Sequence, residues 1–196
     1  RLAEKGPRPN VFVMSATPIP RTLALTLYGD FDISVIDQLP PGRRPVATTV
    51  LSDDDLEKAY RLLIDTVQHD HQAYVVCPLV EESSELSAES ATEMAGRLRE
   101  ALDQYAEESP RLGLVHGQVS AEQREETMEA FRQGDIDILV STTVIEVGVD
   151  VPNATAMVVF NAERFGLAQL HQLRGRIARS SAKARCLLVT PTDSPE

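Results

Sequence analysis

The stretch IDILVSTTVIEVGVDVP, residues 136–152, indicates the fold class of this 196-residue chain. It opens on the apolar run Ile136–Val140, which is of strand length and is followed at once by the hydroxyl residues Ser141, Thr142 and Thr143. A short, nearly continuous apolar run is typical of a strand buried on both faces of a parallel sheet. Ligands of such sheets bind beyond the carboxyl ends of the strands, so the residues after this strand are the first site candidates.

Short apolar runs alternate with longer amphipathic ones along the rest of the chain. Strands are predicted at Val11–Met14, Val46–Leu51, Ala73–Cys77, Arg111–Val115, Ile136–Val140, Ala156–Phe160 and Arg185–Thr190. Helices are predicted at Asp54–Gln68, Ala88–Ala106, Ala121–Arg132 and Leu167–Arg174. This alternation favours an α/β fold of three layers, in which helices cover both faces of a mostly parallel central sheet. Ser52–Asp55 supplies N-cap oxygens for the first long helix, and Ser120 with Gln123 has capping-box spacing for the third.

The beginning of the chain follows another pattern. After one strand and a short helix, Pro40, Pro41, Gly42 and Pro45 interrupt regular structure. We therefore expect residues 1–44 to be the end of a preceding domain and a linker, and residues 45–196 to form one folded domain.

The distribution of charge is more informative than its sum. The net charge of −11 argues against a protein that simply coats nucleic acid. Residues 81–108 hold nine acidic and two basic residues, a local charge of −7, and are interpreted as a solvated helix face. Residues 161–185 hold one acidic and six basic residues, a local charge of +5. A basic cluster on an acidic body suits a phosphate site better than a broad DNA-binding face.

Several classes of protein are excluded or disfavoured by composition. No apolar run approaches the roughly 20 residues that a membrane span needs, and the N-terminus lacks the apolar core of a secretion signal. Cys77 and Cys186 lie in apolar runs and are predicted to be buried, reduced thiols of a cytoplasmic protein. The four histidines have no metal-binding spacing, so no metal site is expected.

Two further strand ends carry candidate residues. Ser15, Ala16 and Thr17 directly follow the first predicted strand, where small hydroxyl residues can couple a bound phosphate to the far side of a cleft. The same tripeptide also suits an ordinary helix cap. His116 and Gly117 follow the strand Arg111–Val115, and a structural role for the histidine is the alternative.

The turn after Thr143 has features of a nucleotide site. Gly148 allows the backbone to approach a ligand closely, and Asp150 can accept hydrogen bonds from a ribose hydroxyl. Hydroxyls and free N–H groups at a strand-to-helix turn also suit phosphate, although an ordinary strand–turn–helix junction has the same pattern.

A cluster of arginines follows in QLHQLRGRIAR, residues 169–179. Guanidinium groups such as those of Arg174, Arg176 and Arg179 can stabilise charge on a transferring γ-phosphoryl group, and a solvated basic helix is the alternative. The only lysines are Lys5, Lys58 and Lys183, none of which follows a glycine. The sequence therefore has neither a glycine–lysine phosphate loop nor a strand that ends in an Asp-Glu pair for Mg²⁺, and it indicates half of a nucleotide site.

Taken together, these motifs resemble superfamily 2 helicases in order and spacing. The tripeptide at residues 15–17 matches motif III, residues 141–152 match motif V, and Gln172 to Arg179 match the Q-x-x-G-R-x-x-R of motif VI. The longer strings SATPIPRTLALTLYGDFDISVIDQLPPGRRPV, VVCPLVEES and FGLAQLHQLRGRIAR look like the RecG family of bacterial branched-DNA helicases. Transcription-repair coupling factors share ATPIPRTL and FGLAQLHQLRGR and are the close alternative.

The resemblance implies a RecA-like second motor domain, the helicase C-terminal half, which faces a first RecA-like domain in cis. ATP with Mg²⁺ would be held mainly by that first domain, so the fragment alone is expected to be inactive. The expected ATP-facing residues are Gly148, Asp150, Gln172, Arg176 and Arg179, with the two arginines catalytic. His116, Gly117, Thr142 and Thr143 would lie near branched or forked DNA, and Ser15, Ala16 and Thr17 would couple the two sites. A monomer in the bacterial cytoplasm is expected.

The sequence departs from the family pattern at two positions and leaves two other classes open. Ala178 and Ser180 stand where the family usually has glycine. A non-catalytic nucleic-acid-binding domain that kept the helicase fold would be marked by loss of the arginines, which are present here. A free-standing doubly wound ligand-binding domain would not begin with a proline-rich linker.

Overall fold

The computed structural model describes Ser34, Ile36 and residues 44–78, 84–142, 151–177 and 182–192, with only the backbone described for 84–90. The chain divides into two units, residues 1–38 and 39–196, and every helix and strand given below lies in the second. The strand predicted at Val11–Met14 lies outside the described residues, and the domain boundary at residue 44 stays a prediction.

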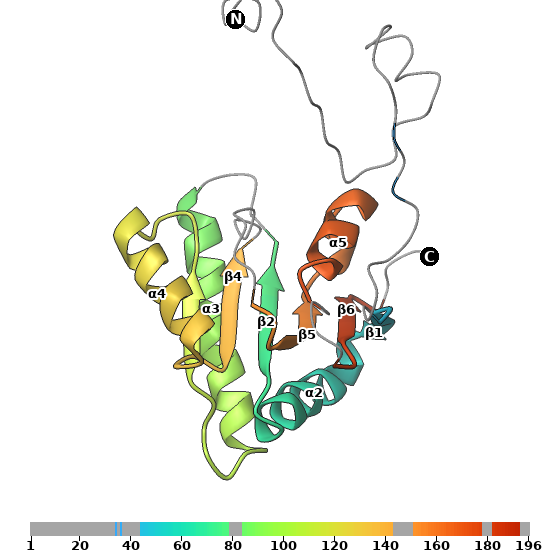
Figure 1. Ribbon diagram of the computed structural model, residues 1–196, viewed down its shortest axis with the longest axis horizontal. Coiled ribbons are helices and arrows are strands. Elements are labelled where there is room, and N and C mark those ends of the chain that lie inside the picture. Colours follow the sequence, from blue (N-terminus) through green and yellow to red (C-terminus); the bar gives the residue numbers. More distant parts are fainter. Residues whose placement is uncertain are drawn as a thin grey trace, which may run out of the picture. The chain divides into compact units, whose positions relative to one another are not determined.

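A six-stranded sheet forms the centre of the second unit, with the strand order β1-β6-β5-β2-β4-β3. All five strand pairings are parallel, so the carboxyl ends of all strands meet at one edge (Figure 1). The strands are β1 (Ala47–Ser52), β2 (Gln72–Cys77), β3 (Leu112–Val115), β4 (Ile138–Thr142), β5 (Ala154–Val159) and β6 (Arg185–Thr190). The predicted α/β class with a parallel central sheet is confirmed.

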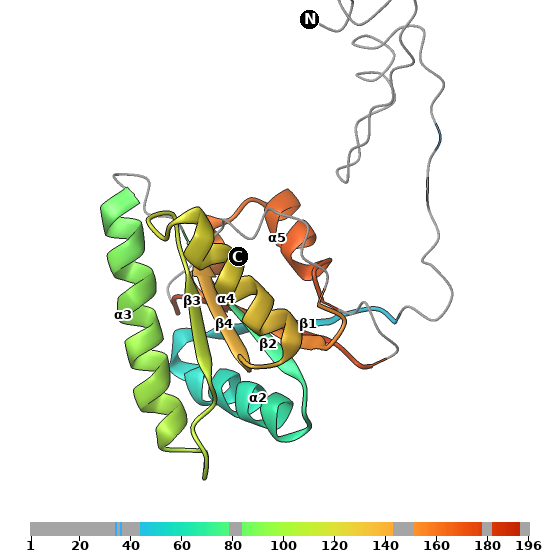
Figure 2. The same ribbon diagram turned by 60° about the vertical axis from the view of Figure 1, so that its left-hand side comes forward.

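Helices cover both faces of this sheet (Figures 1 and 2). They are the α-helices α2 (Leu56–Gln68), α3 (Ser84–Asp103), α4 (Ala121–Gln133) and α5 (Leu167–Arg174), and the 3-10 turns η2 (Asp53–Asp55) and η3 (Ala162–Arg164). One core cluster packs Leu63 of α2 and Leu98 of α3 against Val75 and Val140 of the sheet. The other packs α4, η3 and α5 against Tyr74, Leu139 and Met157. The alternate residues of each strand therefore define an α2/α3 face and an α4/α5 face.

The helix starts agree with the predicted caps only in part. Ser120 caps α4, because its Oγ accepts a hydrogen bond from Gln123 N at 3.2 Å. Ser52 Oγ accepts from Asp54 N, but that bond caps the 3-10 turn η2. The α-helix begins only at Leu56, after Asp55, which makes no side-chain cap bond. The predicted helix start at Asp54 was therefore two residues early.

Both ends of β4 lie two residues later than predicted. The prediction was Ile136–Val140, whereas the strand runs from Ile138 to Thr142. Asp137 lies before the strand because its carboxylate accepts hydrogen bonds from the backbone N of Arg111 at 2.7 Å and from the Arg111 guanidinium. Ser141 and Thr142 are consequently part of the sheet. The second long helix shifts further, from the predicted Ala88–Ala106 to the observed Ser84–Asp103.

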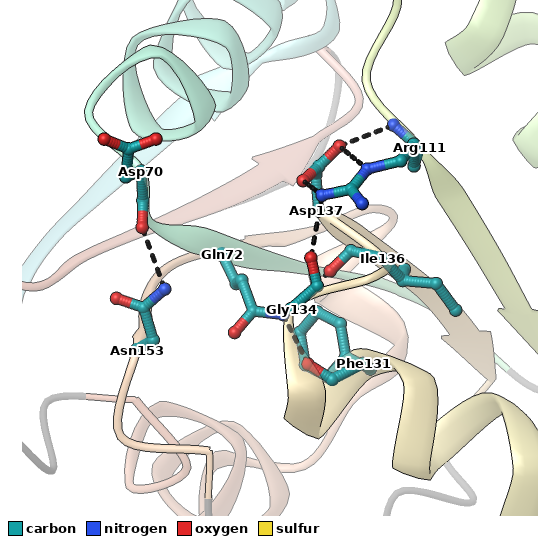
Figure 3. A network of polar contacts seen from close by, with 8 residues as sticks. All are labelled: Asp70, Gln72, Arg111, Phe131, Gly134, Ile136, Asp137 and Asn153. Atoms are coloured by element: carbon teal, nitrogen blue, oxygen red, sulfur yellow. Dashed lines mark hydrogen bonds and ion pairs between the residues drawn. The ribbon is translucent and has the colours of Figure 1, made fainter.

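A polar network joins the elements at the amino-terminal edge of the sheet, opposite the carboxyl ends (Figure 3). The buried amide of Gln72 donates to the carbonyl oxygens of Phe131 at the end of α4 and of Ile136 ahead of β4. Arg111 Nη2 also donates to Gly134 O at 2.7 Å. These bonds fix the end of α4 and the starts of β2, β3 and β4 to one another.

The described helices include none with the length and apolar character needed to cross a membrane.

Candidate nucleotide and nucleic-acid site

The predicted site residues that the structure describes all lie at or beyond the carboxyl edge of the sheet. His116 and Gly117 directly follow β3, and Thr142 ends β4. Gln172 and Arg176 belong to α5 and the turn after it, and Figure 1 shows α5 near the sheet edge toward which β2 and β4 point. This is the edge at which open α/β sheets bind ligands.

The turn at His116 and Gly117 leads from β3 into α4. Val119 N donates to His116 O at 3.2 Å, and Gln118 N donates to His116 Nδ1 at 3.3 Å. The imidazole therefore helps to hold the turn, which supports the structural role left open from the sequence. Gly117 is exposed, and a Cβ atom added to it would meet nothing within 4 Å. Its backbone is accessible to a ligand from outside.

The hydroxyls at the end of β4 are buried instead of facing solvent. Ser141 and Thr142 are both 0% exposed, and neither hydroxyl oxygen has a hydrogen-bond partner within the described part of the chain. Ser141 pairs in register with Val115 of β3, and Thr142 with Cys77 of β2. Direct contact of the Thr142 hydroxyl with DNA would therefore require neighbouring residues to move.

The helix α5 is anchored by its apolar side and exposes its polar side. Leu173 and Ile177 are buried in the α4/α5 core. Gln172 is exposed and Arg176 is partly buried, and the backbone N of Arg176 donates to Leu173 O at 2.9 Å. Gln172 and Arg176, predicted to face ATP, thus lie within one helical turn of each other.

Arg174 is partly buried beside these residues. Its Nη2 lies 3.0 Å from Nδ1 of His171 on the same helix. From Phe165 to Thr192 the sequence contains no acidic residue. Arg185 of this stretch pairs with Asp65 of α2, so the positive charge near α5 comes from the arginines of the helix and of the turn after it. Such a basic segment suits a polyphosphate.

The described candidates form two groups. His116 and Gly117 follow β3, and Thr142 ends the neighbouring strand β4. Gln172 and Arg176 come after β5, which β2 separates from β4. The other predicted site residues lie outside the described residues. They are Ser15, Ala16, Thr17, Thr143, Gly148, Asp150 and Arg179.

Sequence reasoning missed one charged residue next to the first group. Arg124 of α4 is partly buried, and its Nη2 donates to Val119 O at 3.4 Å in the turn after His116. Helical spacing could have revealed it, because Arg124, Met128 and Phe131 follow an i, i+4, i+7 pattern on the side of α4 that faces the core.

No described residues form a group of three or more His, Cys, Asp or Glu side chains that could hold a metal ion. Cys77 and Cys186 are confirmed to be buried and unbonded.

Comparison with known proteins identifies the class. Residues 54–181 match the Helicase conserved C-terminal domain family. The chain is 49% identical over 194 residues to the ATP-dependent DNA helicase RecG of Synechocystis sp., covering 99% of this chain and 23% of that protein. It is 49% identical over 189 residues to RecG of Thermotoga maritima, covering 96% of this chain and 24% of that protein. The solved structure of RecG bound to a three-way DNA junction superposes with a TM-score of 0.74 at 46% identity, over 92% of this chain and 23% of that one.

The chain therefore belongs to the helicase C-terminal domain family, and within it to the RecG type of superfamily 2. Its sheet is accordingly the RecA-like sheet of a helicase C-terminal half. The chain spans about a quarter of the length of these curated relatives, 23% and 24%.

Proposed function

We propose that this chain is the second motor half of an ATP-dependent DNA helicase that translocates on branched or forked DNA. The observation that carries the proposal is the acid-free turn of α5, where Gln172 and Arg176 lie at the carboxyl edge of a RecA-like sheet. The sequence has no glycine–lysine phosphate loop, so this turn supplies half of a site.

The residues at this turn fit a nucleotide triphosphate presented from outside the domain. A basic segment attracts the γ-phosphate, and a carboxamide such as that of Gln172 can donate to its oxygens. ATP supplies the phosphoryl group that is transferred to water. In our proposal ATP and Mg²⁺ are held mainly by a first RecA-like domain in cis, while Gly148, Asp150 and Gln172 contact the nucleotide from this side.

Arg176 and Arg179 are the proposed arginine fingers. A guanidinium in a closed, water-poor cleft stabilises the charge that develops on the transferred phosphoryl group. Closure of the two halves would bring both arginines to the nucleotide, and reopening would move the DNA by one step. Ser15, Ala16 and Thr17 would transmit this closure between the two sites.

DNA is the proposed second ligand, at the ends of β3 and β4. Gly117 offers an exposed backbone there. His116 and Thr143 would add to the contact, and the buried Thr142 would join it only after neighbouring residues move. Support comes from the RecG relative, whose structure is that of a complex with a three-way DNA junction. We propose a monomer of the bacterial cytoplasm that acts in recombination, repair and the processing of stalled forks.

The test is substitution of the two fingers in the full-length protein. Arg176→Ala and Arg179→Ala are each expected to lower DNA-stimulated ATP turnover by ~10³-fold or more. DNA affinity should stay near that of the unchanged protein. Arg164→Ala is the matched control, because Arg164 is exposed on η3 ahead of α5 and is expected to leave turnover unchanged.

Turnover at the unchanged rate in both finger variants would remove these arginines from the mechanism. If the full-length protein bound DNA without any ATP turnover, the alternative of a non-catalytic nucleic-acid-binding domain with a helicase fold would replace the proposal.

A further inference from the structure

Arg124 occupies a costly position in α4. It is the fourth residue of a helix that begins at Ala121. At this end the positive pole of the helix dipole disfavours a cation. Its side chain is on the core-facing side, and its Nε is buried without a hydrogen-bond partner in the described residues. A buried donor left unpaired destabilises the fold, so helix stability does not account for an arginine here.

Arg124 forms no ion pair with the described acidic residues near it in the sequence. Glu122, Glu125 and Glu126 flank it in the sequence, and all three are exposed. None of them forms an ion pair with it, whereas Arg132 on the same helix pairs with Glu129. Among the described residues no carboxylate reaches the Arg124 guanidinium at ion-pair distance. The side chain therefore points away from the acidic outer face of α4.

The contact that the guanidinium does make is with the turn ahead of its own helix. Nη2 donates to Val119 O at 3.4 Å, which is long for such a bond. The same turn is held by Val119 N donating to His116 O, and Arg124 N donates to Ser120 O at 2.9 Å. Arg124 of α4 thus holds the turn through Val119 O, while Gly117 of the same turn is exposed to solvent.

A second unpaired polar group lies on the same side of the sheet. Ser141 is two residues after Leu139 in β4, so the two side chains lie on the same face of the sheet. Because Leu139 packs in the α4/α5 core, Ser141 also faces α4. Its hydroxyl is fully buried and has no partner in the described residues. Two buried polar atoms near the ends of β3 and β4, Arg124 Nε and Ser141 Oγ, thus have no hydrogen-bond partner in the described residues. Unpaired buried groups are typical of a site that gains its hydrogen bonds in another conformation or with a ligand bound.

We propose that Arg124 is a positioning residue that sets the turn from His116 to Val119 from beneath, without itself contacting nucleic acid. The part about nucleic acid rests on the proposed function, in which this turn touches DNA. A DNA backbone seated on the outer side of Gly117 presses the turn toward α4, and the long bond to Val119 O shortens. The planar guanidinium of Arg124 can donate from Nη2 to Val119 O while its Nε stays buried. A lysine ammonium is a single point of charge and cannot do both.

The experiment uses the full-length protein with Arg124→Met and Arg124→Lys, and Arg132→Met as the control on the same helix. Affinity for a fluorescently labelled forked DNA is measured by anisotropy at several salt concentrations. Hydrogen exchange of the backbone amides from Gly117 to Gln133 is measured on the same samples. The salt dependence counts phosphate contacts, because each one contributes about 0.9 to the slope of log affinity against log salt for duplex DNA.

A positioning role predicts that both Arg124 variants bind the fork about ten-fold more weakly with an unchanged salt slope. It also predicts that the Val119 amide exchanges about ten-fold faster while the later amides of α4 keep their rates. Lysine should fail as methionine does, and Arg132→Met should behave as the unchanged protein.

Three results would overturn this inference. A slope reduced by about 0.9 in the methionine variant and restored by lysine would make Arg124 a direct phosphate contact. Faster exchange along the whole of α4 would mean a general loss of stability. Unchanged affinity and exchange in both variants would leave Arg124 without a role. If the unchanged protein showed no salt-dependent binding to the fork, the proposed DNA function would fail, and the exchange rate of Val119 would still decide whether Arg124 holds the turn.

Discussion

At the scale of the residue, Asp137 shows how a single carboxylate can fix a strand start. Its side chain is 18% exposed and accepts hydrogen bonds from both the backbone and the guanidinium of Arg111. Partial burial opposes ionisation, but the bonds from Arg111 more than offset it, so the pKa of Asp137 lies below its ordinary value. The ionised form is therefore favoured in the folded chain, and its bonds stabilise the fold above the ordinary aspartate pKa.

Asp137→Asn should lower the free energy of unfolding by about 1–2 kcal/mol at pH 7, at the lower end because Arg111 is exposed to solvent. Because the folded-state pKa is lowered, this contribution is present above about pH 4 and is lost as the pH falls further toward the folded-state value. Urea unfolding of both proteins at pH 7 and pH 3 measures it. Asp135→Asn, at an exposed neighbouring carboxylate, is the control. Equal stability of Asp137→Asn and the unchanged chain at pH 7 would contradict this account.

The two cysteines should be unreactive in the folded chain. Burial raises the pKa of the Cys77 thiol to about 12 and that of Cys186 to about 11, so little thiolate forms at pH 8. Iodoacetamide should label them at pH 8 only after denaturant has unfolded the chain. Labelling followed by mass spectrometry checks this, and rapid native labelling of either residue would show that its strand opens readily.

At the scale of the element, the buried amide of Gln72 joins β2 to the end of α4 and to the start of β4. Its Nε2 donates to Phe131 O and to Ile136 O, which are 59 and 64 residues away in the sequence. No local pattern could predict bonds over that separation. The sequence placed Gln72 just outside its strand, whereas the structure makes it the first residue of β2.

Gln72→Leu should destabilise the fold by about 1–3 kcal/mol, since it leaves buried carbonyl oxygens without their donor. Thermal or urea unfolding measures the change. Gln68→Leu is the matched control, because Gln68 is exposed at the end of α2 and is expected to have little effect. A stability change no larger than that of the control would mean that these bonds contribute nothing.

The elements themselves were largely predictable, and their ends were not. Periodicity gave α5 and β6 with their observed bounds, since both are delimited by strong local signals. The predicted start of β4 was wrong, because the bonds that hold Asp137 ahead of the strand come from Arg111, a residue 26 positions earlier that lies just before β3. Arg124 was missed for a related reason: whether a charged side chain on an acidic helix faces the core is decided by packing. The basic turn with Gln172 and Arg176 was predictable because motif spacing and helix geometry agree there.

At the scale of the whole molecule, the chain supplies a parallel sheet with two groups of candidate residues along one edge. The group at β3 and β4 is proposed for DNA and the group at α5 for ATP, with β2 between β4 and β5. Since both groups stand on the same rigid sheet, a movement of this domain toward a nucleotide on a neighbouring domain would also move its DNA contacts. That coupling is the physical basis of the proposed translocation.

We propose that this chain provides half of a split ATP site. The most direct measurement is ATP hydrolysis, with and without forked DNA, by the 196-residue chain and by a longer protein that includes the upstream motor half. We expect no turnover from the chain alone and DNA-stimulated turnover from the longer protein. Turnover by the purified chain alone would contradict it, because the nucleotide site would then be complete within these residues.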